Sequence, residues 1–147
     1  LCQQVLDDPN LKYLELLIKD CINDYVKTLN HKVNNIEIVS SWLNEFRRNQ
    51  IIVPHTHANS YISGSLYFSE GSNLVFRPPT IDTFYNISTE FKSSPNIVSV
   101  TPKRGQLVLF PSNITHNVEP ATQERYSLAF NTWPKEYGYP AAEVRIK

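Results

Sequence analysis

The sequence lacks several features that mark common classes of protein. It has no methionine, only two cysteines and four glycines, and its 14 basic residues are balanced by 14 acidic ones. No stretch approaches the roughly 20 apolar residues that cross a bilayer, and no leader-like segment opens the chain, so we expect a soluble, cytoplasmic protein with no membrane contact. The balanced charge and the absence of a basic stripe argue against a nucleic-acid partner.

The two cysteines, Cys2 and Cys21, have neither CxxC nor CxH spacing, and we interpret them as thiols that bind no metal and form no disulfide. A chain that starts at Leu1 and has no methionine is expected to lack its natural beginning. Its 147 residues suffice for one domain that buries roughly two thirds of its unfolded surface without a structural metal or disulfide. A metal in this chain would therefore serve chemistry rather than folding.

The first part of the chain predicts one helix, over about residues 9–30. Apolar residues recur there at intervals of three and four, which places them along one face of a helix. Asp8 before Pro9 is typical of a helix N-cap followed by proline in the first turn. We expect this helix to pack on the outside of a sheet.

The rest of the chain predicts a β-rich core over about residues 36–133. Short β-prone runs alternate with turn residues, and these runs lie at 36–40, 51–53, 61–68, 74–76, 97–100, 106–110 and 126–133. Seven or eight short strands indicate a sandwich or barrel, within a single domain of residues 1–147. Residues 77–95, rich in Pro, Ser, Thr and Asn, predict a long loop of the kind that often covers a site.

Three of the four histidines are spaced as ligands of one metal ion would be. His55 and His57 stand two residues apart at the start of a strand-like run, and His116 follows a second apolar run. In a strand, side chains at i and i+2 point to the same face, so the pair can reach one ion while the third imidazole arrives from a partner strand. Any one of them alone would as easily be a surface histidine, but together they favour a mononuclear metal site.

An arginine accompanies the histidines. Arg125 stands at the head of a third apolar run, and large side chains alternate with small or polar ones over residues 126–131, which predicts one packed and one polar face. Arginine binds a carboxylate through two parallel hydrogen bonds and stays protonated, so it suits an anionic co-substrate beside a metal. Ser127, on the same face, could add a hydroxyl, and Tyr67, on the strand after the histidine pair, could add a phenol.

These segments resemble the 2-oxoglutarate and Fe(II)-dependent oxygenases, in the branch that includes prolyl hydroxylases and a group of uncharacterised bacterial and phage oxygenases. Residues 105–112, then 115–120 around His116, then 125–131 with Arg125-Tyr126-Ser127, resemble the family's C-terminal motif. Residues 55–68, a histidine-rich turn followed by a Ser-Gly-rich strand ending in tyrosine, resemble the uncharacterised group. The resemblance covers about residues 36–133 and implies a double-stranded β-helix, the jelly-roll and cupin-like fold, with the site inside.

The resemblance also implies cofactors and an activity. It implies that Fe(II) is held by His55, His57 and His116, and that 2-oxoglutarate is bound by Arg125, Ser127, Tyr67 and Ser63. Asn59 and Asn131 are candidates for supporting the ligands, and no catalytic residue is expected beyond the metal centre. The implied reaction uses O2 to convert 2-oxoglutarate to succinate and CO2 while a C–H bond is hydroxylated. The expected partner is a peptide or protein substrate of the prolyl type, or a small molecule; no oligomeric state is favoured.

One position departs from the family's usual motif, which is His-x-Asp or His-x-Glu. His57 occupies the position of the carboxylate, so three neutral imidazoles would leave the iron one positive charge richer. A second register would make His57 the first ligand and place Asn59 at the carboxylate position, with His55 behind it or at the substrate. We favour His55 and His57 as the pair, because imidazole is a far better iron ligand than an amide oxygen. Asp82 could also supply a carboxylate from the predicted loop.

Two hypotheses from other classes use the same residues. A three-histidine, cupin-type metalloenzyme could use oxygen without a keto acid, or use zinc to activate water. A non-catalytic β-helix domain could serve binding or assembly. Trp42 and Trp133 are interpreted as core or rim packing, and the glycosylation sequons at Asn86 and Asn113 as chance matches.

Overall fold

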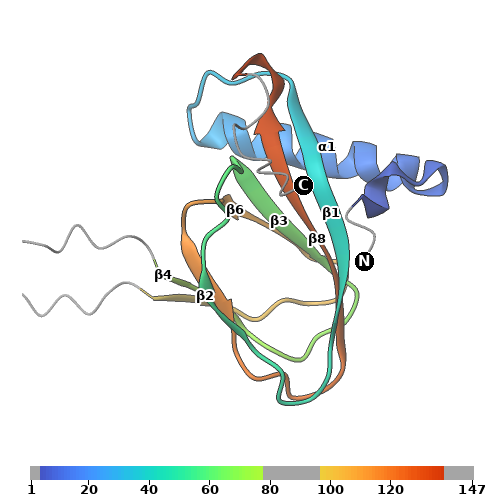
Figure 1. Ribbon diagram of the computed structural model, residues 1–147, viewed down its shortest axis with the longest axis vertical. Helices are drawn as coiled ribbons and strands as arrows, with labels where there is room; N and C mark the ends of the chain where they lie inside the picture. The colour runs from blue at the N-terminus through green and yellow to red at the C-terminus, as the bar shows by residue number, and fades with distance from the viewer. Residues whose placement is uncertain (1–3, 78–96, 138–147) are drawn as a thin grey trace, which may run out of the picture.

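The fold consists of two facing antiparallel sheets of four strands each (Figure 1). It is seen in a computed structural model that describes residues 4–77 and 97–137. The first sheet contains, in spatial order, β1 (Ile36–Phe46), β8 (Arg125–Pro134), β3 (Ile62–Tyr67) and β6 (Leu107–Pro111). The second contains β2 (Ile52–His55), β7 (Thr115–Val118), β4 (Leu74–Arg77) and β5 (Val98–Val100). The predicted fold class, mainly β with a double-stranded β-helix, is confirmed.

One α-helix, α1 (Lys12–Thr28), lies across the outer face of the first sheet (Figure 1), as the sequence predicted. Two 3-10 helices, Val5–Asp7 and Pro9–Leu11, precede it. Asp8 accepts a hydrogen bond from the Asn10 backbone amide, so its predicted capping role is confirmed, although the turn that it caps is 3-10 rather than α. A third 3-10 helix, Lys135–Tyr137, follows β8.

The apolar stripe of α1 explains why the helix packs there. Ile18, Ile22 and Val26 are buried against the outward-facing Leu128 and Phe130 of β8. Each of these side chains is almost completely removed from water, which stabilises the folded chain by about 1.5–3 kcal/mol for a large aliphatic or aromatic residue. The alternation predicted for residues 126–131 therefore places the opposite residues of β8 in the space between the sheets.

The structure differs from the predicted strands at two places. β1 extends through Phe46, well past the predicted end at residue 40, and pairs with β8 along its length. β7 is absent from the predicted runs, although His116 was expected to lie on a partner strand, because its four residues, Thr-His-Asn-Val, are mostly polar and carry no strand pattern. The predicted loop at 77–95, with Asp82 and Asn86, lies almost wholly outside the described residues. Of the cysteines, Cys21 is free, and Cys2 is also outside them.

No helix in the described part of the chain is long and apolar enough to span a membrane.

Candidate metal and co-substrate site

Strand pairing brings two of the histidines together. His55 ends β2, His116 lies on β7, and the two residues are register partners in the antiparallel ladder. His57 lies beyond the end of β2, and its backbone N–H donates to the Ser112 carbonyl at 2.9 Å. Asn59, in the turn that follows, has a φ of +58°. The prediction that His55 and His57 share one strand is therefore wrong, because β2 ends at His55 and His57 bonds to Ser112 outside the β2–β7 ladder, yet the two rings still lie side by side with centroids 5.1 Å apart.

The three imidazoles nevertheless converge, as the sequence predicted. Their ligand atoms all lie within 4.8 Å of one another. The ring centroids of His116 lie 4.3 Å from His55 and 4.9 Å from His57. His116 is buried, and the other two rings are partly buried. This cluster of three histidines could hold one metal ion.

The hydrogen bonds of the rings decide which nitrogen is available to a metal. Each Nδ1 lies close to an oxygen that can only accept a hydrogen bond: Val53 O at 2.8 Å for His55, Ile114 O at 3.0 Å for His116, and Asn131 Oδ1 at 2.6 Å for His57. Each Nδ1 therefore carries the proton, and each Nε2 keeps a lone pair. The Nε2 atoms of His55 and His57 face each other at 3.1 Å, and two lone pairs at that distance repel unless a cation lies between or beside them. The donor set fits a metal ion.

Burial favours the neutral form of two of these rings, His116 and His57. It lowers the pKa of His116 to about 4, and the neighbouring imidazoles act in the same direction. Burial also lowers the pKa of His57, against the opposing effect of the hydrogen bond to Asn131. Neutral imidazole is the form that binds metals, so burial favours the ligating form of His116 and His57.

Arg125 is buried without a carboxylate beside it in the described part of the chain. Its side chain begins β8, is 2% exposed, and lies between the rings of Phe46 and Tyr67, at 4.8 and 5.0 Å from their centroids. Nη1 donates to Ser72 Oγ at 2.5 Å, but Nε has no hydrogen-bond partner among residues 4–77 and 97–137. In those same ranges no carboxylate lies within 4.0 Å of the guanidinium. A buried cation is costly unless an anion is paired with it, so this arrangement fits an anionic ligand.

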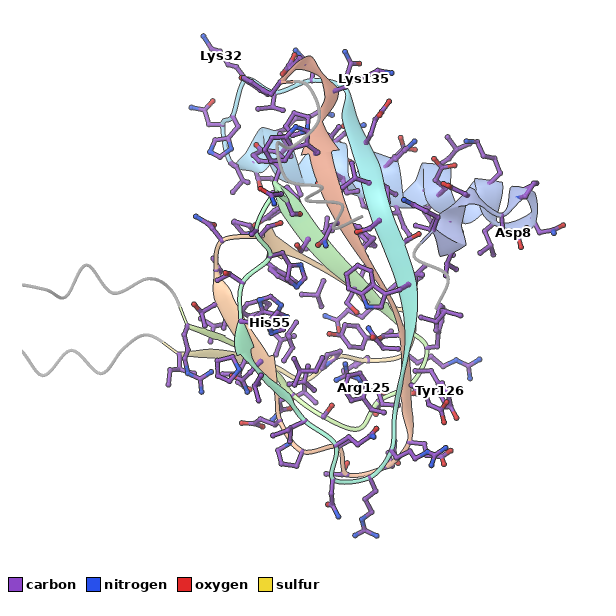
Figure 2. All side chains as sticks on the ribbon, in the orientation of Figure 1. Asp8, Lys32, His55, Arg125, Tyr126 and Lys135 are labelled. Atoms are coloured by element: carbon purple, nitrogen blue, oxygen red, sulfur yellow. The ribbon has the colours of Figure 1, made fainter. Side chains whose placement is uncertain are left out.

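One cavity of about 190 Å³ connects the two groups, since the three histidines, Arg125 and Tyr67 all line it. The side chains of His55 and Arg125 enter it from facing sheets (Figure 2). The cavity is smaller than the pockets that hold drug-sized ligands, so it suits a small molecule. Figure 2 shows both labelled side chains pointing into the space between the sheets.

The remaining predicted residues are placed as follows. Ser127 is fully buried on the inner face of β8, and its Oγ has no partner within the described residues. Ser63, predicted to bind the co-substrate, lies 2.9 Å from His57 Nδ1 and 2.7 Å from Asn131 Oδ1 instead of lining the cavity. Asn131 contacts His57, as expected of a supporting residue, whereas Asn59 is exposed in its turn. Their functional roles stay predictions.

Two residues of the site were missed by the sequence reasoning. Trp42, expected to serve only packing, lines the cavity, and its ring centroid lies 6.3 Å from that of His57. Ser72 holds Arg125 but comes from the turn before β4, where no motif distinguishes it. The alternation along β1, which turns Leu43 and Glu45 outward and Trp42 inward, could have indicated Trp42. Ser72 is revealed only by the tertiary fold.

Comparison with known proteins identifies the family. The family described as "Putative 2OG-Fe(II) oxygenase" matches residues 40–131, well over half of the chain. The chain belongs to this family of 2OG-Fe(II) oxygenases, whose name carries the co-substrate and the metal expected from the sequence. A search of curated proteins finds no match.

Solved structures with the same fold include a Pseudomonas putida prolyl-4-hydroxylase, with 18% identity, a TM-score of 0.53, and coverage of 80% of this chain and 62% of that one. A Trichoplax adhaerens prolyl hydroxylase, in complex with a hypoxia inducible factor peptide fragment, has 14% identity, a TM-score of 0.55, and coverage of 81% and 56%. HygX from Streptomyces hygroscopicus, with nickel and 2-oxoglutarate bound, has 9% identity, a TM-score of 0.53, and coverage of 69% and 57%. This chain therefore spans less than two thirds of the length of each, and the likeness shows the fold.

Proposed function

We propose that this chain is a 2-oxoglutarate- and Fe(II)-dependent dioxygenase that hydroxylates a C–H bond of a peptide or protein, of the prolyl type, or of a small molecule. The observation that carries the proposal is the buried guanidinium of Arg125, which has no carboxylate partner among residues 4–77 and 97–137 and lines the same cavity as three imidazoles whose Nδ1 atoms all face acceptor oxygens. One group calls for an anion and the other for a cation. A keto acid bound beside a metal ion satisfies both.

The residues divide the work between the two facing walls. Nε2 of His55, His57 and His116 would hold Fe(II), the metal that suits imidazole ligands with open positions. With 2-oxoglutarate and O2, the bound metal supplies an oxidant that replaces C–H by C–OH while the keto acid is split into succinate and CO2. The protein contributes the position of the co-substrate and a site from which water is largely excluded.

The arginine wall orients the co-substrate. The guanidinium of Arg125, held between two aromatic rings, lines the cavity and keeps Nε without a hydrogen-bond partner among the described residues. It would bind the far carboxylate of 2-oxoglutarate, with the orphaned Ser127 hydroxyl as a second donor and the Tyr67 phenol nearby. The keto acid end is then directed towards the histidines on the opposite wall.

The class of substrate is supported less directly. The Trichoplax adhaerens hydroxylase of the same fold was solved with a peptide, which favours a peptide or protein substrate for this chain by analogy. We propose no nucleic-acid or membrane partner, in keeping with the balanced charge of the chain.

The test is the turnover of 2-oxoglutarate by chain reconstituted with Fe(II) without oxygen and then exposed to air. Succinate should form at a rate that depends on both Fe(II) and 2-oxoglutarate, and His116→Ala should abolish it while His31→Ala, which changes the histidine outside the cluster, should not. Metal binding without any binding or turnover of 2-oxoglutarate would instead favour the three-histidine metalloenzyme. A wild-type chain that binds no metal would favour the non-catalytic domain.

A further inference from the structure

Next to the three-histidine cluster lies a row of hydrogen-bonded polar side chains, partly or fully buried, that ends on His57. The Oγ atoms of Ser60 and Ser112 are 2.7 Å apart, those of Ser112 and Ser63 are also 2.7 Å apart, and Ser63 Oγ lies 2.7 Å from Asn131 Oδ1. Asn131 Oδ1 in turn lies 2.6 Å from His57 Nδ1. Ser63 and Ser112 are fully buried.

The chemistry of these groups gives the chain one direction. The carbonyl oxygen of Asn131 can only accept, so both Ser63 and His57 Nδ1 donate to it. A hydroxyl has a single proton, so Ser63, having donated to Asn131, must accept from Ser112, and Ser112 must accept from Ser60. Ser60 Oγ also lies 3.4 Å from the Thr132 carbonyl, and the much shorter 2.7 Å contact with Ser112 is the one that takes its proton. Every donor therefore points towards Asn131 Oδ1.

The consequence falls on the other nitrogen of the ring. If the Asn131 amide were reversed, its NH2 group would donate to His57 Nδ1, the ring proton would move to Nε2, and that nitrogen could no longer bind a metal. The Ser63 hydroxyl contacts both Asn131 Oδ1 and His57 Nδ1, so it holds the amide and the ring in one arrangement. The other two histidines need no such device, because backbone carbonyls fix their Nδ1 atoms.

We infer that Asn131, held by the hydroxyl chain Ser60–Ser112–Ser63, is a positioning residue that makes His57 a metal ligand by fixing its Nδ1–H form. His57 needs this support because it lies beyond the end of β2, where strand pairing does not orient its ring. The inference rests on the proposed metal site but concerns residues that line a different part of the interior.

The first test needs neither metal nor activity. Nitrogen-15 NMR of chain labelled at histidine and freed of metal reports which ring nitrogen is protonated. His57 of the wild-type chain should show a protonated Nδ1, and Asn131→Ala should shift it towards the mixture of forms seen for free histidine. A wild-type His57 protonated at Nε2 would overturn the inference.

The second test is the affinity for Co(II), measured by titration and by the visible spectrum of the bound ion. Asn131→Ala should weaken binding about 10- to 100-fold, the usual effect of removing a partner of a ligating histidine. Ser63→Ala should weaken it less, and Asn131→Asp, which keeps an acceptor for Nδ1–H, should restore it. Ser41→Ala is the matched control, since Ser41 is also fully buried in the first sheet but bonds to the Leu6 amide, away from the cluster.

The outcomes separate the two proposals. Equal Co(II) affinity of the wild type, Asn131→Ala and Ser63→Ala would overturn this inference and leave the proposed function intact. A wild-type chain that binds no Co(II) would overturn the proposed function itself. If Asn131→Ala does not fold, the NMR of the wild type and the comparison of Ser63→Ala with Ser41→Ala still decide the matter.

Discussion

The two walls of the cavity are built on opposite principles. On the second sheet, the Nδ1 atoms of His55 and His116 each donate to a backbone carbonyl. Each Nε2 therefore keeps a lone pair that can bind a cation. On the first sheet, Arg125 and Ser127 keep buried donors with no acceptor among the described residues. The difference teaches that the two walls need ligands of opposite charge: one has acceptors without a cation, and the other has donors without an anion. A metal completes one wall and a carboxylate completes the other.

The largest effect is expected from a change to the histidine wall. His116→Ala should weaken metal binding by more than about 100-fold, because losing a ligand costs more than losing a ligand's partner. His116 is the buried member of the cluster and faces His55 directly across the β2–β7 ladder. Calorimetric titration of Co(II) into metal-free chain measures the loss. His31→Ala should bind Co(II) as tightly as the wild type does. If His116→Ala bound Co(II) as tightly as His31→Ala, His116 would not be a metal ligand.

A change to the arginine wall is expected to act on the co-substrate and leave the metal alone. Arg125→Ala should raise the Kd for 2-oxoglutarate about 10- to 100-fold, since a charge-assisted hydrogen bond contributes about 1.5–3 kcal/mol. Arg125→Lys should recover part of the loss, because it keeps the charge without the planar fork. Titration of 2-oxoglutarate into metal-loaded chain gives both values. Should Arg125→Ala lose Co(II) affinity in the absence of 2-oxoglutarate, the two walls would not be separable.

The pH dependence of stability should reveal the histidine wall without any ligand. Since the pKa of His116 is lowered from 6.5 to about 4, the unfolded chain binds an extra proton between these values. The free energy of unfolding of the metal-free chain should therefore be highest above pH 6.5, fall as the pH drops through this window, and level off with respect to His116 below about 4. Urea unfolding across the window measures the slope. His116→Ala should flatten the slope and His31→Ala should not; parallel curves would show that His116 is not shifted.

The smallest effect is expected from the residue that supports Arg125. Ser72→Ala removes the hydroxyl that accepts from Arg125 Nη1. A hydrogen bond from a charged group contributes about 1.5–3 kcal/mol where it is lost outright, but the guanidinium of this variant keeps its charge and both aromatic rings, so the Kd for 2-oxoglutarate should rise only about two- to tenfold. Metal affinity should not change. A variant that binds 2-oxoglutarate as tightly as the wild type would show that the two aromatic rings alone hold the guanidinium.

Periodic side chains made much of this fold predictable from the sequence. The apolar stripe of α1 and the alternation along β8 depend only on local repeats, and they predicted a packed face and a polar face of β8; in the structure Leu128 and Phe130 on one face pack against the helix and Arg125 on the other lines the cavity. Asn131 was found in the same way, since it lies on the inner face of β8.

What was missed depends on contacts distant in the sequence. β7 is short and polar, and it becomes a strand because β2 and β4 pair with it on either side. His57 was assigned to a strand because the sequence shows its spacing from His55 but does not show that β2 ends at His55. The contact of Ser63 with Asn131 was not predicted, because the two residues are 68 positions apart in the sequence.

The alignment of β2 with β7 has a consequence of its own. β2 is the outermost strand of its sheet, it is only four residues long, and its pairing is irregular between Ile52 and His55. Sliding it by a single position would turn the imidazole of His55 outward while α1 and the larger sheet stayed as they are. The metal affinity of this chain therefore also reports the register of β2 against β7. It would detect a shift of one residue that spectroscopy of overall folding would not register.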